Sequence, residues 1–283
     1  MKFIHLTDPH LVERPQKLFD LDVQERLEAA VVSINTHHGD AELCVLTGDL
    51  THWGEPAAYD DINGIMGRLV IPWHVILGNH DDRDTFREAF PDAADDGNGF
   101  VQYSLLTSAG RFLLLDTLDA GTPAGAYCPD RLAWLGANLE AARDNGEEVF
   151  LFMHHAPMAV GIGALDNIRL RADDADAFGQ LIGGFDNVRH IFFGHLHRPC
   201  HGSWRRIPFS SVRATAHHTA LTLDANTPLT VCHEKPGYAA VLIGEDSVVV
   251  HDHSYLEEGG EFAYDRGIPD NADEAPEHQR DWN

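Results

Sequence analysis

The segment "NVRHIFFGHLHRP", residues 187–199, joins an apolar run to two closely spaced histidines. Residues 187–193 are typical of a short strand buried on both faces of a sheet. His195 and His197 come directly after it, one residue apart. Because the chain holds 19 histidines among 283 residues, the pair alone could be an ordinary loop. Its meaning depends on the residues at the ends of the other strands.

Four further apolar runs, residues 2–6, 42–46, 73–77 and 148–153, also end at potential metal ligands. The groups that come after them, in chain order, are Asp8 and His10, Asp49, Asn79, and His154. Each alone could be a turn residue or a cap. In open α/β sheets, however, ligands bind beyond the carboxyl ends of the strands. Five strand ends of this kind predict one shared site.

Helical patterns separate these strands. Apolar residues recur at helical spacing in residues 22–38, 55–69, 129–144 and 173–184. Strands that alternate with helices indicate an α/β protein with a largely parallel sheet. After residue 200, strands and turns continue without helices, which predicts a small β-rich C-terminal appendage. We therefore expect a catalytic core, a cap or oligomerisation segment, strands returning to the core, and an acidic tail, at residues 1–204, 205–236, 237–256 and 257–283.

The composition excludes several classes of protein. A formal net charge of −25 argues against a partner such as a nucleic-acid polymer or an anionic membrane, either of which needs a basic face. No apolar run is long enough for a membrane span, and the N-terminus lacks the pattern of a signal peptide. The four cysteines have no paired spacing. We expect a cytoplasmic protein with reduced thiols and a solvated acidic tail.

The candidate ligands suit a pair of metal ions. They contain no thiolate, so they do not match a cysteine-rich structural zinc site. Carboxylate, imidazole and amide groups favour Mn, Fe, Co or Zn as divalent ions. Seven ligands are too many for one tetrahedral ion but fit two ions if Asp49 bridges them. Two such ions could hold a phosphoryl group and activate a water molecule. The complete set is Asp8, His10, Asp49, Asn79, His154, His195 and His197.

The order of these motifs resembles the calcineurin-like metallophosphoesterases over about residues 1–200. The matching motifs are Asp8-Pro9-His10, Gly48-Asp49, Gly78-Asn79-His80-Asp81, His154-His155 and Gly194-His195-Leu196-His197. The local sequences "FMHHAP" and "GNHDD" are most similar to bacterial class III cyclic-nucleotide phosphodiesterases and the related glycerophosphodiesterases. The resemblance implies a four-layer αββα sandwich with two metal ions at the sheet edges.

The resemblance also implies roles for individual residues. Asp8, His10, Asp49 and His197 would hold one ion, and Asp49, Asn79, His154 and His195 would hold the other. His80 would be catalytic, because it would face the phosphate and either hydrogen-bond a phosphoryl oxygen or protonate the leaving alkoxide. The alternative for His80 is a residue that merely precedes a helix. The implied substrate-binding residues are Asn79, His80, His155 and His217.

One position departs from the family pattern. Many relatives carry Asp where this chain has His52, so an Asp–His dyad and a protein-phosphatase activity are in doubt. His52 either points at the substrate or lies on the surface. His155 is open between a substrate contact and a core imidazole, and His217 is expected to contact substrate. Arg83 and Arg131 carry no signal beyond that of surface charges.

The expected function is a metal-dependent phosphodiesterase, a phosphoric diester hydrolase that attacks phosphorus with a metal-bound hydroxide. Its substrate would be a small diester, either a 3′,5′-cyclic nucleotide such as cyclic AMP or a glycerophosphodiester, because basic surface for a polymer is lacking. A phosphomonoesterase or nucleotidase with the same centre is the alternative. A non-catalytic scaffold would lack ligands, and none is missing. Short strands in residues 205–236 predict a homo-oligomer.

Overall fold

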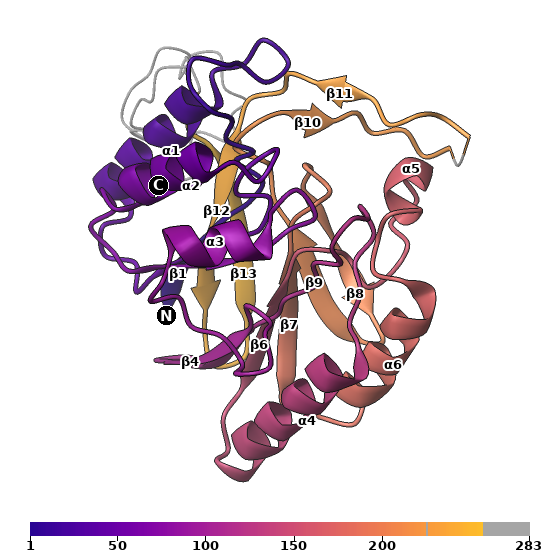
Figure 1. The fold of residues 1–283 in the computed structure, drawn as a ribbon. Coiled ribbons are helices and arrows are strands. Elements are labelled where there is room, and N and C mark those ends of the chain that lie inside the picture. Colours follow the sequence, from indigo (N-terminus) through magenta and orange to yellow (C-terminus); the bar gives the residue numbers. More distant parts are fainter. Residues whose placement is uncertain (225, 257–283) are drawn as a thin grey trace, which may run out of the picture.

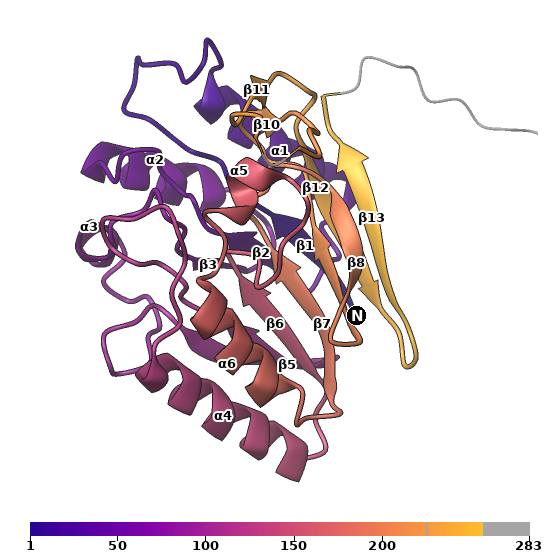
Figure 2. The ribbon, with the colours of Figure 1, turned by 90° about the vertical axis from the view of Figure 1, so that its right-hand side faces the viewer.

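Two β-sheets lie face to face, with helices on the outer face of each (Figure 1, Figure 2). This arrangement is seen in a computed structural model that describes residues 1–224 and 226–256. The predicted acidic tail, residues 257–283, lies outside the described residues. The four-layer α/β sandwich expected from the sequence is confirmed.

The first sheet has the strand order β13-β12-β1-β2-β3. Its strands are β1 (Lys2–Leu6), β2 (Cys44–Thr47), β3 (Trp73–Ile76), β12 (Gly237–Ile243) and β13 (Val248–Ser254). Strands β1, β2 and β3 are parallel, whereas β12 runs antiparallel to β1. The helices associated with this half are α1 (Val23–His37), α2 (Pro56–Met66) and α3 (Arg83–Ala89).

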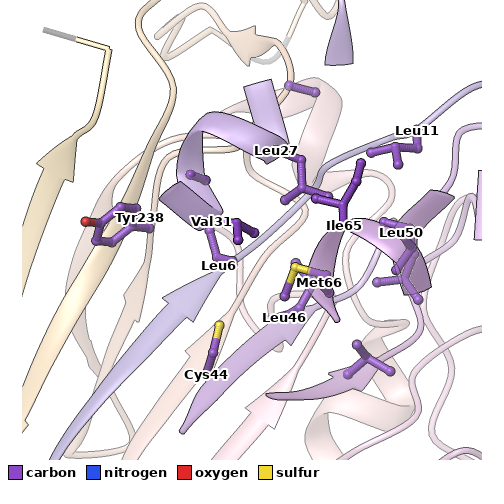
Figure 3. Close-up of a cluster of buried hydrophobic side chains, with 14 of the residues drawn as sticks. Leu6, Leu11, Leu27, Val31, Cys44, Leu46, Leu50, Ile65, Met66 and Tyr238 are labelled. Carbon is purple, nitrogen blue, oxygen red and sulfur yellow. The ribbon is translucent and has the colours of Figure 1, made fainter. Parts of the chain in front are cut away.

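The helices of the first half pack on the sheet through a continuous apolar layer. Leu27 and Val31 of α1 and Ile65 of α2 face Leu6 and Leu46 of the strands, and all five side chains are buried (Figure 3). Helix α1 begins at Asp22, whose carboxylate accepts a hydrogen bond from the backbone N–H of Glu25. This layer fixes the loops that come after β1, β2 and β3.

The second sheet has the order β4-β5-β6-β7-β9-β8. Its strands are β4 (Tyr103–Thr107), β5 (Gly110–Leu114), β6 (Val149–Met153), β7 (Val188–Phe193), β8 (Cys200–Trp204) and β9 (Ile207–Ser211). Strands β5, β6, β7 and β9 are parallel. The helices of this half are α4 (Pro129–Asp144), α5 (Gly163–Asp166) and α6 (Ala172–Ile182). A separate pair, β10 (His218–Thr219) and β11 (Val231–Cys232), forms an arm beside them (Figure 1).

The inner faces of the two sheets meet in an aromatic core. The Phe3 ring lies 5.2 Å from Phe112, 5.6 Å from Phe152 and 5.3 Å from Phe192, and all four side chains are fully buried. Edge-to-face contacts of this kind are favourable between aromatic rings. The core therefore sets how the strand ends of one sheet face those of the other.

Most predicted elements are present, within a few residues of their expected bounds. Helices α3 and α5 and the hairpin β4–β5 escaped prediction, because these helices have only seven and four residues and β4 is partly exposed rather than continuously apolar. The expected boundary at residue 204 falls in the turn between β8 and β9, which both belong to the second sheet. The division into core and cap stays a prediction. Within the described residues, no helix is long and apolar enough to cross a membrane.

Candidate metal centre

The carboxyl ends of five strands from both sheets bring the seven predicted ligands together. Strands β1, β2 and β3 lead into ligands of the first half, and β6 and β7 into ligands of the second. All seven side chains except Asn79, which is partly exposed, are buried. Buried groups of this polarity need partners or a bound cation.

One group of four ligands converges on a single point. One donor atom each from Asp8, His10, Asp49 and His197 lies within 4.8 Å of the others. The His10 Nε2 is 3.3 Å from an Asp49 oxygen and 3.0 Å from the His197 Nε2. The His197 Nε2 is 3.5 Å from an Asp8 oxygen. Two oxygens and two nitrogens thus face a common centre.

A hydrogen bond on the far side of the His197 ring orients this ring for binding a cation. The His197 Nδ1 lies 2.9 Å from the backbone oxygen of His217. Because a carbonyl oxygen only accepts, Nδ1 carries the hydrogen of this bond, and Nε2 is the ring nitrogen that faces the centre. Metal-binding histidines are commonly oriented by such a bond from the other ring nitrogen.

The second group surrounds the other side of Asp49. The His154 Nε2 lies 3.3 Å from an Asp49 oxygen and 3.3 Å from the Asn79 side-chain oxygen. Its Nδ1 donates to the Thr47 carbonyl at 2.8 Å. The His195 Nε2 is buried and has no hydrogen-bond partner among the described residues. Such an unpartnered atom is costly unless something binds it, and a second ion would meet that need.

The backbone at these ligands is strained. Five of them have positive φ angles, which non-glycine residues rarely adopt. The angles are 52° at Asp8, 46° at His10, 49° at Asp49, 66° at His195 and 53° at His197. Each angle turns the chain sharply at a strand end. Strain gathered at one place in this way marks a functional site rather than a simple connection.

Two glycines permit the close approach of the strand ends. A Cβ atom on Gly78 would collide with the backbone and carboxylate of Asp49, and one on Gly194 would collide with the Thr7 hydroxyl. Both positions therefore require a residue without a side chain. At Gly194 the missing side chain lets the backbone approach the end of β2 closely.

The electrostatics reflect two carboxylates enclosed with several imidazoles. Burial alone would raise the pKa of Asp49, but His154 and His10 hold it well below its usual range. Burial raises the pKa of Asp8. For His154 burial acts downward, yet Asp49 and Asp8 raise its pKa to about 9. Bound cations would balance the negative charge of the two carboxylates. They would also displace the proton that the raised pKa keeps on His154.

His80 and His52 lie together at the edge of the first group. The His80 backbone N–H donates to Asp49 at 2.9 Å, and its Nδ1 donates to the His52 carbonyl at 2.9 Å. The His52 ring stacks on that of His80 at 4.6 Å, and its Nδ1 is 3.0 Å from the His10 Nδ1. His52 is only 8% exposed, so the surface position considered for it is wrong.

The other two predicted substrate contacts also border the centre. His155 is fully buried, with Nδ1 2.8 Å from the Thr117 hydroxyl and Nε2 3.3 Å from the Pro123 carbonyl. The His217 ring lies 4.4 Å from that of His197 and 5.2 Å from that of His10. Contact of either histidine with substrate stays a prediction.

Several supporting residues were missed. The buried Asp81 carboxylate accepts from the Gly78, Leu50 and Thr51 N–H groups at 2.9, 3.1 and 3.2 Å, and from the Tyr59 hydroxyl at 3.0 Å. It thereby ties the loop after β3 to the loop after β2. The only local signal in the sequence for this role of Asp81 is its place directly after Asn79-His80. Nothing local in the sequence identifies Tyr59 as its partner.

The expectation of surface charge is wrong for two arginines. Arg83 forms a two-pronged ion pair with the buried Asp116, with both N–O distances 2.9 Å. Arg131 is only 3% exposed and donates to the carbonyls of Asp116 and Leu118. Both side chains are thus structural, and they join α3 and α4 to the loop after β5.

Known proteins have sequences or folds similar to those of this chain. The chain is 40% identical over 266 residues to a probable cyclic nucleotide phosphodiesterase of Rhodopseudomonas palustris, covering 93% of this chain and 96% of that protein. It is 27% identical over 286 residues to a glycerophosphodiester phosphodiesterase, GpdQ, of Enterobacter lignolyticus, covering 97% and 98%. A dimetal phosphatase structure from Danio rerio has a similar fold, with a TM-score of 0.67 at 16% identity over 90% of this chain and 96% of that one. Residues 1–199 match the calcineurin-like phosphoesterase family, and the chain belongs to that family.

Proposed function

We propose that the protein is a dinuclear-metal-dependent phosphodiesterase that hydrolyses small phosphodiesters, either 3′,5′-cyclic nucleotides or glycerophosphodiesters. The observation that carries the proposal is the position of Asp49, which has one oxygen 3.3 Å from both the His10 Nε2 and the His154 Nε2. Two divalent ions, when bound, would neutralise phosphoryl charge and lower the pKa of a water molecule. The donor set suits Mn, Fe, Co or Zn.

The residues divide between the two ions around Asp49. The first ion would be held by Asp8, His10, Asp49 and His197, and the second by Asp49, Asn79, His154 and His195. The His195 backbone N–H donates to Asp8 at 3.1 Å, which steadies the carboxylate. These contacts hold the ligands in place before any substrate binds.

His80 is the proposed catalytic residue. Its Nδ1 bond to the His52 carbonyl fixes the ring and leaves Nε2 for the substrate. From there His80 would hydrogen-bond a phosphoryl oxygen or pass a proton to the leaving alkoxide. Asn79, His155 and His217 complete the proposed substrate-binding set.

Turnover of small phosphate esters by the Mn(II)-loaded protein tests the function. We expect faster hydrolysis of bis(p-nitrophenyl) phosphate than of p-nitrophenyl phosphate, together with hydrolysis of cyclic AMP or a glycerophosphodiester. Absence of diester turnover with both metals bound would exclude the proposal. Faster monoester turnover would favour the phosphomonoesterase alternative.

Replacing Asn79 tests the division of ligands. Asn79→Ala should lower occupancy of one ion, with activity falling in parallel, whereas the exposed Asn63→Ala should match the unmodified protein. Metal content of the dialysed variants, measured by mass spectrometry, gives the stoichiometry. If Asn79→Ala keeps two ions and full activity, the assignment of ligands is wrong.

We also propose a homo-oligomer that forms through residues 205–236. In support, Leu221, Leu223 and Leu229 are exposed on the segment that joins β10 to β11, and exposed leucines gain from burial against a partner. Sedimentation at micromolar concentration should give more than one chain per particle, and Leu223→Glu should reduce that number. A monomer would contradict the proposal.

We also propose a cytoplasmic location, because the cysteines are reduced. All four are free thiols, and Cys44 is buried in the core of the first half. Reduced cysteines are usual in the cytoplasm. Fractionation of the source cells with an antibody against the chain would test this location.

A further inference from the structure

Two aromatic side chains stand exposed beside the candidate metal centre. Phe19 is 45% exposed and Trp53 is 67% exposed. The Phe19 ring lies 4.8 Å from His217 and 6.2 Å from His52, and the Trp53 ring lies 4.3 Å from His52. Single exposed apolar residues are common, but two that share a contact next to a reaction centre are not explained by chance exposure alone.

The backbone at Phe19 is strained. Leu18 and Leu21 exchange two backbone hydrogen bonds of 3.1 and 2.9 Å, which closes a two-residue turn. The central residues, Phe19 and Asp20, have φ angles of 50° and 66°. Turns with two positive φ angles strongly prefer Asn or Gly, and a bulky aromatic residue is disfavoured there. Such strain is often found at ligand-binding positions.

The exposed rings contact imidazoles that in turn contact the proposed ligands of the first ion. His52 lies between Trp53 and His10, with its Nδ1 3.0 Å from the His10 Nδ1. The His217 carbonyl accepts from His197, another ligand of that ion. Phe19 and Trp53 are thus separated from the metal ligands by one layer of imidazoles. A group one sugar away from the reacting phosphorus would reach them.

The chemistry of this rim favours a flat, aromatic occupant. Phenyl and indole rings offer large faces for stacking, and every nucleobase has a face that can stack on them. The glycerol and alcohol groups of a glycerophosphodiester have no such face. A nucleobase binds by stacking without cationic side chains, which suits a protein of net charge −25.

We propose that Phe19 and Trp53 form a stacking platform for the nucleobase of a 3′,5′-cyclic nucleotide. The platform would make cyclic nucleotides, rather than glycerophosphodiesters, the preferred substrates. This inference rests on the proposed phosphodiesterase function and specifies its substrate class. Phe19 and Trp53 act here on specificity, because they contact the base rather than the phosphate.

The test compares an aromatic diester with a non-aromatic one. Steady-state kinetics of the Mn(II)-loaded protein are measured with cyclic AMP and with glycerophosphoethanolamine, for Phe19→Ala, Trp53→Ala and the double variant. The ratio of kcat/KM for cyclic AMP to that for glycerophosphoethanolamine should fall roughly tenfold for each ring removed, mainly through KM. Trp53→Phe should recover most of the loss. Leu106→Ala, at an exposed position on β4, is the control and should keep the ratio.

A second variant separates function from folding. Phe19→Asn suits the turn better than Phe, so it should raise the thermal midpoint while it lowers the preference for cyclic AMP. A gain in stability without a change in preference would overturn the proposal. So would equal losses on both substrates, or a change in particle size as the only effect of Phe19→Ala, since the rings would then cover a partner chain. If the unmodified protein hydrolyses neither diester, the proposed function itself fails.

Discussion

The two halves of the sandwich contribute different chemistry to the candidate metal centre. Loops after β1, β2 and β3 supply both carboxylates and the amide, from Asp8, Asp49 and Asn79, together with one imidazole. Loops after β6 and β7 supply only imidazoles: His154 comes after β6, and His195 and His197 come after β7. Neither half alone supplies the complete set of candidate ligands for either ion. The centre therefore depends on docking of the two sheets.

Hydrogen bonds across the centre join the halves. His154 of the second half donates to the Thr47 carbonyl of the first at 2.8 Å. The His195 N–H donates to the Asp8 carboxylate at 3.1 Å. Negative charge is thus concentrated in one half and oriented by donors from the other. This division predicts that residues of the first half determine the affinity for the ions. It also predicts that the interface between the sheets determines how the ligands are arranged around them.

Loss of the shared carboxylate should have the largest effect. Asp49→Asn removes the charge that contacts ligands of both groups, so both ions should bind more weakly and diester turnover should fall on the order of a thousandfold. Metal content after dialysis and turnover of bis(p-nitrophenyl) phosphate measure the two effects. Asp60→Asn, on the exposed face of α2, is the matched control and should change neither. Full activity of Asp49→Asn would refute the shared role.

Weakening the contact between the two sheets should have the second largest effect. Phe152→Ala opens a cavity in the aromatic core and should lower the free energy of unfolding by about 3–5 kcal/mol, as measured by urea unfolding. It should also reduce metal affinity in the fraction that remains folded, because the strand ends lose their alignment. Phe178 is equally buried but belongs to α6, in the outer layer of the second half. Phe178→Ala should therefore cost similar stability with less effect on metal affinity. Equal effects on affinity would show that sheet docking is unimportant for the centre.

A smaller effect is expected inside the first half. Asp81→Asn replaces an acceptor that faces three backbone N–H groups, so the free energy of unfolding should fall by about 1–3 kcal/mol. Metal affinity should fall roughly tenfold or more, because the loop carrying Asn79 is no longer held against the loop carrying Asp49. Calorimetric titration with Mn(II) measures the affinity. Tyr59→Phe removes one hydrogen bond to the same carboxylate and should cost only about 1 kcal/mol. A larger loss for Tyr59→Phe would contradict the proposed role of Asp81.

The sequence predicts the centre better than its surroundings. Candidate ligands such as Asp49 and His154 come directly after buried strands. Parallel strands of one sheet place their carboxyl ends at one edge, so neighbours in this sequence pattern become neighbours in space. The four-layer fold was inferred from the resemblance to the family. Both inferences rest on short motifs, and the residues within each motif lie within a few positions of each other in the chain.

Features that depend on contacts between distant segments were not predictable. Arg83 meets Asp116 across 33 residues, and Tyr59 meets Asp81 across 22. No local pattern distinguishes such arginines from surface charges before the elements dock. The burial of His52 beside His10 likewise results from two loops that meet only in the folded chain. The positive φ angles at the ligands also result from tertiary structure, because no preference of Asp or His requires them.

The last predicted effect appears only when the pH changes, and it concerns a histidine buried where the two halves meet. His5 has its Nε2 2.9 Å from the Thr47 hydroxyl and its ring against Phe152 and Phe192. Burial, and then the nearby His190, lower the pKa of His5 to about 3. In the unfolded chain this pKa is about 6.5. As the pH falls below that value, the unfolded chain takes up a proton that the folded chain refuses, so the fold loses stability.

His5→Gln removes this titration while it keeps a polar group near Thr47. Between pH 7 and pH 5 the variant should lose about 2 kcal/mol less unfolding free energy than the unmodified protein. Urea unfolding of metal-free protein measures the difference, so that proton release from the metal ligands does not enter. The exposed His251→Gln should keep the original pH dependence. An unchanged slope for His5→Gln would mean that acid weakens the contact between the halves through other groups, whereas a reduced slope would place that sensitivity at the sheet interface itself.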